Sequence, residues 1–148
     1  MSSQGDRGGG YVATCRSLAG VAVLAVMSTA TPAPAHAEGP SLHRVVYTVV
    51  SQTPFAADIY YREFDPPDWA AYSHNPYEFS PRSEFEVAPD RPWVREVMLR
   101  DPQRWAMVAV TSGPAAVTPH FRCSLEVDGV VVGTASGPRG ALCSLRNW

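Results

Sequence analysis

Alternating apolar and polar residues near the C-terminus constrain the fold of this chain more than any other feature. Phe121, Cys123, Leu125 and Val127 form an apolar row, and polar residues occupy the positions between them. Such period-2 alternation is typical of a β-strand with one buried face. Asp128-Gly129 follows the row and leads into three consecutive valines. An Asp-Gly pair between two apolar runs predicts a tight hairpin, because both turn positions need a positive φ.

Similar strand patterns recur upstream and are separated by Pro and Gly turns. We therefore predict an all-β protein, a small immunoglobulin-like antiparallel β-sandwich of about seven strands with one disulfide. A helix around residues 97–107 is not predicted, because Pro102 lies in its middle and would cost about 3 kcal/mol in a helix interior. The other predicted strands are residues 43–50, 57–61, 83–88, 93–99, 105–111 and 141–145.

We expect residues 1–37 to be a signal peptide and residues 38–148 to be the β-sandwich domain. Two arginines precede an uncharged, largely apolar run over residues 17–30, and small residues then lead to Ala35-His36-Ala37. This order is typical of a cleaved secretory signal. The alternative is an uncleaved membrane anchor, but 14 residues are few for a hydrocarbon core about 30 Å thick. No stable membrane span is expected after cleavage.

Two cysteines remain after the expected cleavage, Cys123 and Cys143, and an even pair in an exported protein predicts a disulfide. A zinc site is the competing interpretation, but it needs four ligands and no Cys-x-x-Cys or nearby His is present. In the predicted hairpin, Cys123 lies opposite about Thr134. A last strand that continued the meander would hold Cys143 about 10 Å from Cys123, whereas bonded cysteines have Cα atoms about 4.4–6.8 Å apart. The last strand should therefore cross to the opposite sheet or pair on the far side of the Phe121 strand.

The charge balance argues against a nucleic-acid partner. All 12 basic side chains are Arg and the net charge is −2, whereas nucleic acid requires a basic face. The sequence contains no nucleophile elbow, no His-Glu-x-x-His, no glycine-rich phosphate loop and no EF-hand spacing. We therefore expect no enzyme activity, no cofactor and no bound metal.

Residues 65–81 form the most unusual segment, with four prolines and four aromatic residues in 17 positions. Proline restricts the backbone and aromatic rings supply contact area, so one interpretation of the segment is a rigid loop that binds a sugar, a lipid or a protein. The interpretation that we favour is a long connection whose aromatic rings cover one end of the sandwich core. The candidate binding residues are Trp69, Tyr72, His74, Tyr77 and Phe79.

Several short motifs also occur in an order that points to a known family. They are Val46-Tyr47-x-Val49, Asp58-Ile59-x-Tyr61, Pro92-Trp93, Arg122-Cys123-x-Leu125-x-Val127-Asp128-Gly129-Val130-Val131 and Ala141-Leu142-Cys143. In these motifs the chain resembles the MmpS proteins, small mycobacterial membrane proteins that act as transport accessory factors. The resemblance implies an extracytoplasmic β-sandwich with one disulfide in a mycobacterial-type cell envelope. MmpS proteins keep an N-terminal membrane anchor and lack the segment between Arg62 and Ser83, so we interpret this chain as a secreted relative.

Together these observations predict a non-enzymatic secreted or cell-envelope protein, an accessory or binding module for an envelope protein or lipid. The alternative function is a soluble carrier that holds a lipid or small apolar ligand between the sheets, although the sheets of so small a sandwich are usually filled by their own side chains. A hydrolase is the third hypothesis, and no pair of residues has the spacing that it needs. The sequence makes no prediction of oligomeric state.

Overall fold

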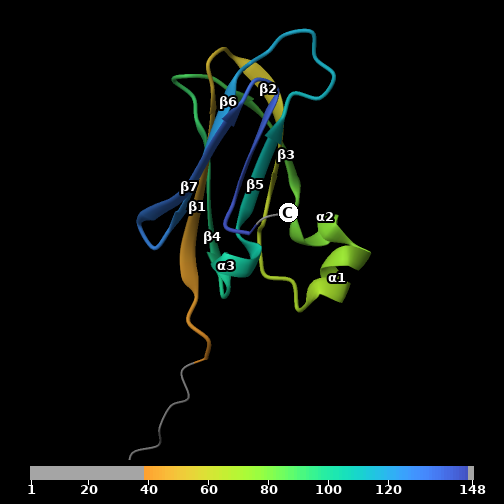
Figure 1. The fold of residues 1–148 in the computed structure, drawn as a ribbon, viewed down its shortest axis with the longest axis vertical. Helices are drawn as coiled ribbons and strands as arrows, with labels where there is room; N and C mark the ends of the chain where they lie inside the picture. Colours follow the sequence, from red (N-terminus) through yellow and green to blue (C-terminus); the bar gives the residue numbers. More distant parts are fainter. Residues whose placement is uncertain (1–38, 147–148) are drawn as a thin grey trace, which may run out of the picture. The chain divides into compact units, whose positions relative to one another are not determined.

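The computed structural model describes residues 39–146, which form two four-stranded antiparallel sheets packed face to face (Figure 1). The strand order is β4-β1-β6-β7 in one sheet and β3-β2-β5-β8 in the other. The predicted β-sandwich is confirmed, with eight strands rather than seven. The strands are β1 (His43–Ser51), β2 (Phe55–Tyr61), β3 (Arg82–Val87), β4 (Trp93–Leu99), β5 (Met107–Thr111), β6 (Phe121–Val127), β7 (Val130–Gly137) and β8 (Gly140–Ser144).

Three short helices lie where the sequence predicts none: α1 (Trp69–His74), α2 (Pro76–Phe79) and α3 (Pro102–Trp105). Pro102 is the first residue of α3, where its missing N–H has no intrahelical partner to lose. The Asp101 side chain caps this helix by accepting a hydrogen bond from the Arg104 N–H at 3.1 Å. The predicted strand over residues 105–111 therefore starts only at Met107.

The core lies between the two sheets and consists of the apolar rows that the alternation predicts. Val45, Tyr47 and Val49 of β1 are fully buried, as is Ile59 of β2. The Tyr47 hydroxyl donates a hydrogen bond to the Arg62 carbonyl oxygen at 3.0 Å, so its polar atom is satisfied inside the core. Burial raises the pKa of Tyr47 because the charged phenolate is disfavoured there.

The predicted Asp128-Gly129 hairpin between β6 and β7 is confirmed, and both turn residues have a positive φ, 50° and 85°. A β-bulge interrupts the pairing beyond the turn, with Val132 as the extra residue. Cys123 therefore lies opposite Ala135 rather than Thr134, one position further along β7 than the regular register predicts.

The disulfide between Cys123 and Cys143 is confirmed, with Cα atoms 6.0 Å apart. It joins the two sheets, because Cys123 belongs to β6 and Cys143 to β8, which pairs with β5. Of the two placements predicted for the last strand, the structure has the crossing to the opposite sheet.

Within residues 39–146, no helix combines the length and the apolar character needed to cross a bilayer. The expected signal peptide, residues 1–37, lies outside the described residues.

Candidate binding groove

Residues 62–81, called the helical segment below, pack on the outer face of sheet β3-β2-β5-β8 (Figure 1). Ile59 and Tyr61 point into the core, so Tyr60, which lies between them in β2, points to the opposite face of the sheet. The ring of Tyr77 lies 6.3 Å from that of Tyr60, and the ring of Tyr72 lies 4.4 Å from the Arg62 guanidinium carbon. The segment therefore covers the outside of a sheet, whereas the sequence alternative had it cover the end of the core.

Local capping explains why the helical segment is not a simple loop. Asp68 begins α1, and its side chain accepts a hydrogen bond from the Ala71 N–H at 2.8 Å. Pro76 begins α2 at a position where proline is favoured. The two ends of the segment are joined by a hydrogen bond from the Glu63 N–H to the Phe79 carbonyl oxygen at 3.1 Å. The segment is thus a closed excursion from the sheet.

Three aromatic rings form a cluster on this face of the sheet: Trp69 and Tyr72 of α1 and Trp105 of α3. Their ring centroids lie 5.1 to 5.7 Å apart, within the range of favourable aromatic pairs. The guanidinium of Arg146 lies 4.1 Å from the Trp69 ring. None of the three rings belongs to the core between the sheets, so this aromatic cluster is a second, separate packing centre.

Arg62 lies beneath the aromatic cluster and has no exposed surface. Its Nε donates a hydrogen bond to the Trp105 carbonyl oxygen at 3.2 Å. Nη1 and Nη2 are buried and have no hydrogen-bond partner among the residues that the structure describes. The rings of Tyr72 and Trp105, at 4.4 and 5.4 Å, stabilise the cation through its contact with their faces.

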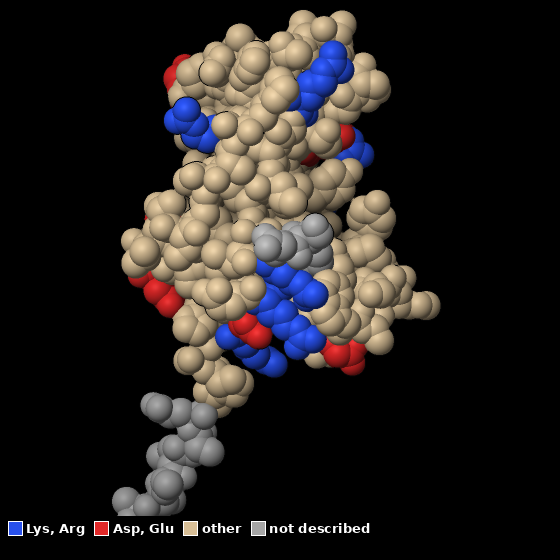
Figure 2. Space-filling view, in the orientation of Figure 1, with Lys and Arg blue, Asp and Glu red and all other residues tan. Residues whose placement is uncertain are grey.

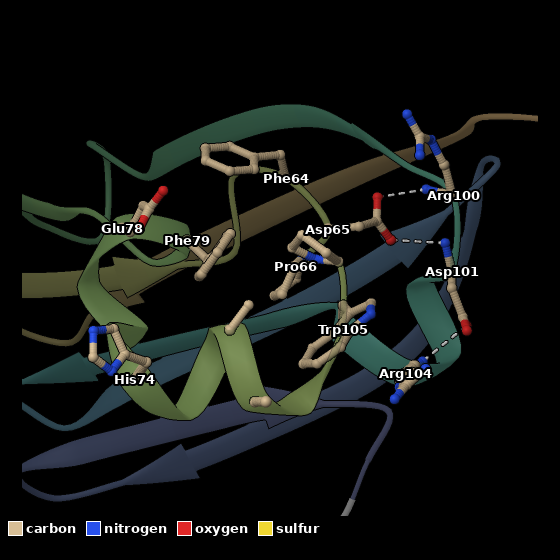
Figure 3. A pocket seen from close by; sticks show the side chains of 13 residues that line it. Phe64, Asp65, Pro66, His74, Glu78, Phe79, Arg100, Asp101, Arg104 and Trp105 are labelled. Carbon is tan, nitrogen blue, oxygen red and sulfur yellow. Dashed lines mark hydrogen bonds between the residues drawn. The ribbon is translucent and has the colours of Figure 1, made fainter.

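An open groove of about 1070 Å³ lies between the helical segment and α3 (Figure 3). Aromatic and proline side chains lie along its floor. His74 and Glu78 lie at one end, and Arg100 and Arg104 lie at the other (Figure 3). The residues that line the groove are Phe64, Asp65, Pro66, Pro67, Ala70, Ala71, His74, Glu78, Phe79, Arg100, Asp101, Arg104 and Trp105.

The two aspartates in the groove hold backbone rather than facing a ligand. The Asp65 carboxylate accepts hydrogen bonds from the N–H groups of Arg100 and Asp101 at 2.8 and 2.9 Å, and Asp101 caps α3 (Figure 3). Among residues 39–146, no group of three or more His, Cys, Asp or Glu side chains is placed to hold a metal ion. What the groove presents to a ligand is therefore apolar contact, with basic charge at the end of Arg100 and Arg104 and the Glu78 carboxylate at the other end.

Basic side chains gather on the face of the molecule where α3 lies (Figure 2). Arg104 belongs to α3, Arg100 lies two residues before this helix, and both line the groove. The guanidinium of Arg104 also lies 5.0 Å from the Trp105 ring, so one end of the groove combines positive charge with an aromatic face.

The five predicted binding residues do not form one surface. His74 and Phe79 line the groove, whereas Trp69 and Tyr72 lie in the aromatic cluster behind it. Tyr77 is 71% exposed and packs against Tyr60 on another side of the segment.

The half of the groove that α3 supplies is not predicted from the sequence. The signal for it is Asp101-Pro102, because Asp before Pro is a typical N-cap and first residue of a helix. If Pro102 is interpreted only as a helix breaker, no helix is predicted here, and nothing places Arg104 and Trp105 beside the helical segment. The burial of Arg62 has no such signal, since Arg is almost never fully buried without a partner.

Comparison with known proteins shows where the chain belongs. The family model described as "Rv2576c beta-sandwich domain" matches residues 47–143, about two thirds of the chain. The match begins within β1, ends within β8, and includes both cysteines and the helical segment. No solved structure matches the chain.

The relatives that match are mycobacterial. "Uncharacterized protein Rv2576c" of Mycobacterium tuberculosis (strain H37Rv) and "Uncharacterized protein Mb2606c" of Mycobacterium bovis are each 36% identical over 124 residues. Each alignment covers 84% of this chain and 79% of the relative. Membership of the MmpS family stays a prediction, whereas the match over nearly the whole sandwich is direct: this chain belongs to the Rv2576c beta-sandwich domain family.

Proposed function

We propose that this protein is a non-enzymatic binding module of the cell envelope or the secreted fraction, and that its groove binds a segment of an envelope protein. The observation that carries the proposal is the composition of the groove floor. Phe64, Phe79 and Trp105 come together there from separate parts of the chain, and none of them belongs to the core between the sheets. Large aromatic side chains in a concave surface are typical anchoring points for a partner. Phe64, which is 43% exposed, is the ring that a partner can reach, and the nearly buried Phe79 and Trp105 support it from below.

The form of the groove favours a protein segment over a lipid tail. The groove is open and has charged groups at both ends, His74 and Glu78 at one and Arg100 and Arg104 at the other (Figure 3). A peptide segment combines apolar side chains with polar and charged groups, and therefore matches this mixture. A lipid chain requires a more enclosed and more apolar site.

The packing between the sheets supports the groove rather than the interior as the binding place. Tyr47, Phe121 and Leu125 are each at most 1% exposed and fill the space in which a carried lipid would lie. A place outside the cytoplasm is supported by the Cys123–Cys143 disulfide, because such bonds persist in oxidising compartments. The accessory role that the MmpS resemblance implies agrees with a binding module.

Site-specific crosslinking in the native cell envelope tests this function. A photoreactive amino acid replaces His74, an exposed residue that lines the groove. The matched control carries it at Val94, which is 56% exposed on β4 in the other sheet. We expect one protein species to crosslink from position 74 and not from position 94, with its identity read by mass spectrometry.

A further substitution ties the crosslink to the groove floor. Phe64 is 43% exposed, so Phe64→Ser should leave the sandwich folded and reduce the crosslinked product at least tenfold, since few residues carry most of the binding energy of an interface. Equal crosslinking from positions 74 and 94 would contradict the proposal. Crosslinking of lipid alone from position 74 would replace the protein partner with a lipid.

A further inference from the structure

We infer that Arg62 is a covered anion-binding site, whose guanidinium pairs with a carboxylate or phosphate group that enters between the rings of Tyr72 and Trp105. The inference goes beyond the proposed function, because this site lies behind the groove and Arg62 does not line it. It rests on four observations. The cation is buried, most of its N–H donors have no acceptor within residues 39–146, the nearby carboxylates are hydrogen-bonded to other groups, and the helix that covers it, α1, is short and not buried.

Arg62 is a permanent buried charge with most of its donors unused. A guanidinium has five N–H donors and stays protonated in proteins. Only the Nε donor of Arg62 has an acceptor within residues 39–146, while Nη1 and Nη2 are buried without one. Burial of a charge without a counterion or hydrogen-bond acceptors costs free energy. An anion or another acceptor that bound here would satisfy the unpaired N–H donors of Arg62.

Among the described residues, three exposed arginines have the carboxylate partners that the buried Arg62 lacks. Arg44, Arg82 and Arg91 are solvent-accessible, and each forms an ion pair with at least one carboxylate. Surface pairs of this kind contribute little to stability. The fully buried Arg62, where an ion pair would matter most, has no carboxylate partner among the described residues.

The acidic side chains that follow Arg62 in the sequence bind elsewhere. Glu63 accepts a hydrogen bond from the Tyr61 hydroxyl at 3.4 Å. Asp65 accepts two backbone N–H groups at 2.8 and 2.9 Å, in the connection that leads into α3. Neither carboxylate pairs with Arg62, and its Nη1 and Nη2 have no acceptor among residues 39–146. A counterion would therefore come from outside these residues.

The cover over Arg62 is of a kind that can move. α1 has six residues and none of them is buried. The Glu63–Phe79 backbone hydrogen bond closes the helical segment at its base. α1 lies beyond that closure, and its rings contact Arg62, Trp105 and Arg146. Short elements with little buried apolar surface belong to the low-stability end of a protein.

Displacement of the Tyr72 ring, which lies 4.4 Å from the guanidinium carbon, would open a path to the buried Nη1 and Nη2 donors of Arg62. Two parallel N–H groups of Arg match the two oxygens of a carboxylate or phosphate, which bind in a bidentate manner. The surrounding rings exclude water, and the low local dielectric strengthens such a pair. The class of ligand is therefore an oxyanion, and its apolar portion would replace the Tyr72 ring.

Nuclear magnetic resonance of the arginine side chains tests the inference on the full chain. The Nε–H signal of Arg62 is followed during titration with sodium phosphate and, separately, with sodium acetate, while chloride keeps the ionic strength constant. We expect a saturable shift of the Arg62 signal with at least one of the two anions. The Arg95 signal serves as an internal control, because the Arg95 guanidinium is exposed and stacks on Tyr61, 5.1 Å away, outside this site.

Two variants separate the anion site from general effects. Tyr72→Ala removes the cover and leaves Arg62 intact, so it should tighten binding of the same anion at least threefold. Arg62→Gln should weaken binding at least tenfold, whereas Arg95→Gln should leave it unchanged. If Arg62→Gln fails to fold, the comparison between Tyr72→Ala and the unaltered chain still decides the outcome.

The absence of a saturable Arg62 shift in both the unaltered chain and the Tyr72→Ala variant, with either anion, would overturn the inference. So would binding that Arg62→Gln leaves intact. Failure of this test is distinguishable from failure of the proposed function. Anion binding at Arg62 without a crosslink from His74 would refute the groove partner alone, and a groove-specific crosslink without anion binding would refute only the anion site.

Discussion

The two faces of sheet β3-β2-β5-β8 are covered in different ways. The inner face packs Ile59, Val108 and Val110, each at most 3% exposed, against the other sheet. A disulfide also crosses this interface. The outer face is covered by the helical segment, whose contacts are aromatic rings around the buried cation of Arg62. One face is held by aliphatic packing and a covalent bond, and the other by a few specific contacts.

This difference predicts two levels of stability in one small domain. Burial of aliphatic surface is non-directional and cooperative, so the sandwich should unfold as a unit. Helices as short as α1, α2 and α3 are not stable on their own, so the helical segment depends on its ring contacts. Loss of these contacts should release the segment while the sandwich stays folded.

The largest expected effect comes from the disulfide. Replacement of Cys123 and Cys143 together by Ser should lower the free energy of unfolding by about 2–5 kcal/mol. The bond ties the last strand, β8, to β6 in the opposite sheet, so β8 should become the first site of proteolysis. Urea unfolding followed by far-ultraviolet circular dichroism, together with mass mapping of early proteolytic cuts, measures both effects.

A thiol assay on the unfolded, unreduced chain of residues 38–148 is the matching control. The disulfide predicts no free thiol in the chain that starts after residue 37, since Cys123 and Cys143 are its only cysteines. Two free thiols per chain would contradict the covalent link. Early cuts inside residues 62–81, with β8 intact in the double Ser variant, would show that the disulfide is not what holds the last strand in place.

A smaller effect is expected from the outer face. Trp69→Ala with Tyr72→Ala removes two of the three rings of the aromatic cluster. Full burial of such rings is worth about 3–5 kcal/mol each, but these two are only partly buried, so we expect a total loss of about 2 kcal/mol. Limited proteolysis should cut first within residues 62–81 while the circular dichroism of the sheets is kept.

Tyr77→Ala provides the matched control for this variant, because Tyr77 belongs to the same segment and is 71% exposed. It should change stability by no more than about 0.5 kcal/mol. If the Trp69/Tyr72 double variant is as stable as Tyr77→Ala, the aromatic cluster does not hold the segment. If it instead unfolds the whole domain cooperatively, the two faces form a single unit.

The comparison also explains how much of this protein the sequence predicts. The inner face follows from period-2 alternation, and the crossing of β8 follows from the reach of one disulfide between Cys123 and Cys143. Both depend on rules that act over a few residues or on a fixed bond length. The β-bulge at Val132 has no such signal, because a run of identical valines has no alternation to reveal the shift.

The outer face was less predictable for physical reasons. Asp68 caps α1, and Pro76 and Pro102 begin α2 and α3. The same residue types are typical of turns, so composition alone predicts a loop. Tertiary contacts decide between the two, and those contacts involve Arg62, which sequence rules place at the surface. His74 and Phe79 do line the groove, and both were predicted because the segment that contains them is unusually rich in proline and aromatic residues.

The smallest effect is expected at Asp128, a surface turn that belongs to neither face. Its side chain accepts hydrogen bonds from His43 Nδ1 at 2.6 Å and from the Arg44 N–H at 2.9 Å. The hydrogen bond with His43, and then that with the Arg44 N–H, lower the pKa of Asp128. The folded state therefore favours the charged carboxylate, and this contribution is present above the ordinary Asp pKa of about 3.9.

As the pH falls through the lowered pKa of Asp128 in the folded protein, that contribution is lost. Asp128→Asn keeps an oxygen that can accept the Arg44 N–H and tolerates the positive φ of this turn position, so it removes the charge with little change in backbone. The variant should unfold at a slightly lower urea concentration than the unaltered chain at pH 5–6, and the difference should shrink as the pH falls below the ordinary Asp pKa of about 3.9. Urea midpoints measured across this pH range provide the check. A difference in urea midpoint that persists or grows in acid would show that Asp128 acts through turn geometry rather than charge. A loss of stability as large as that of the Trp69/Tyr72 variant would show that this surface turn is one of the contacts that hold the domain together.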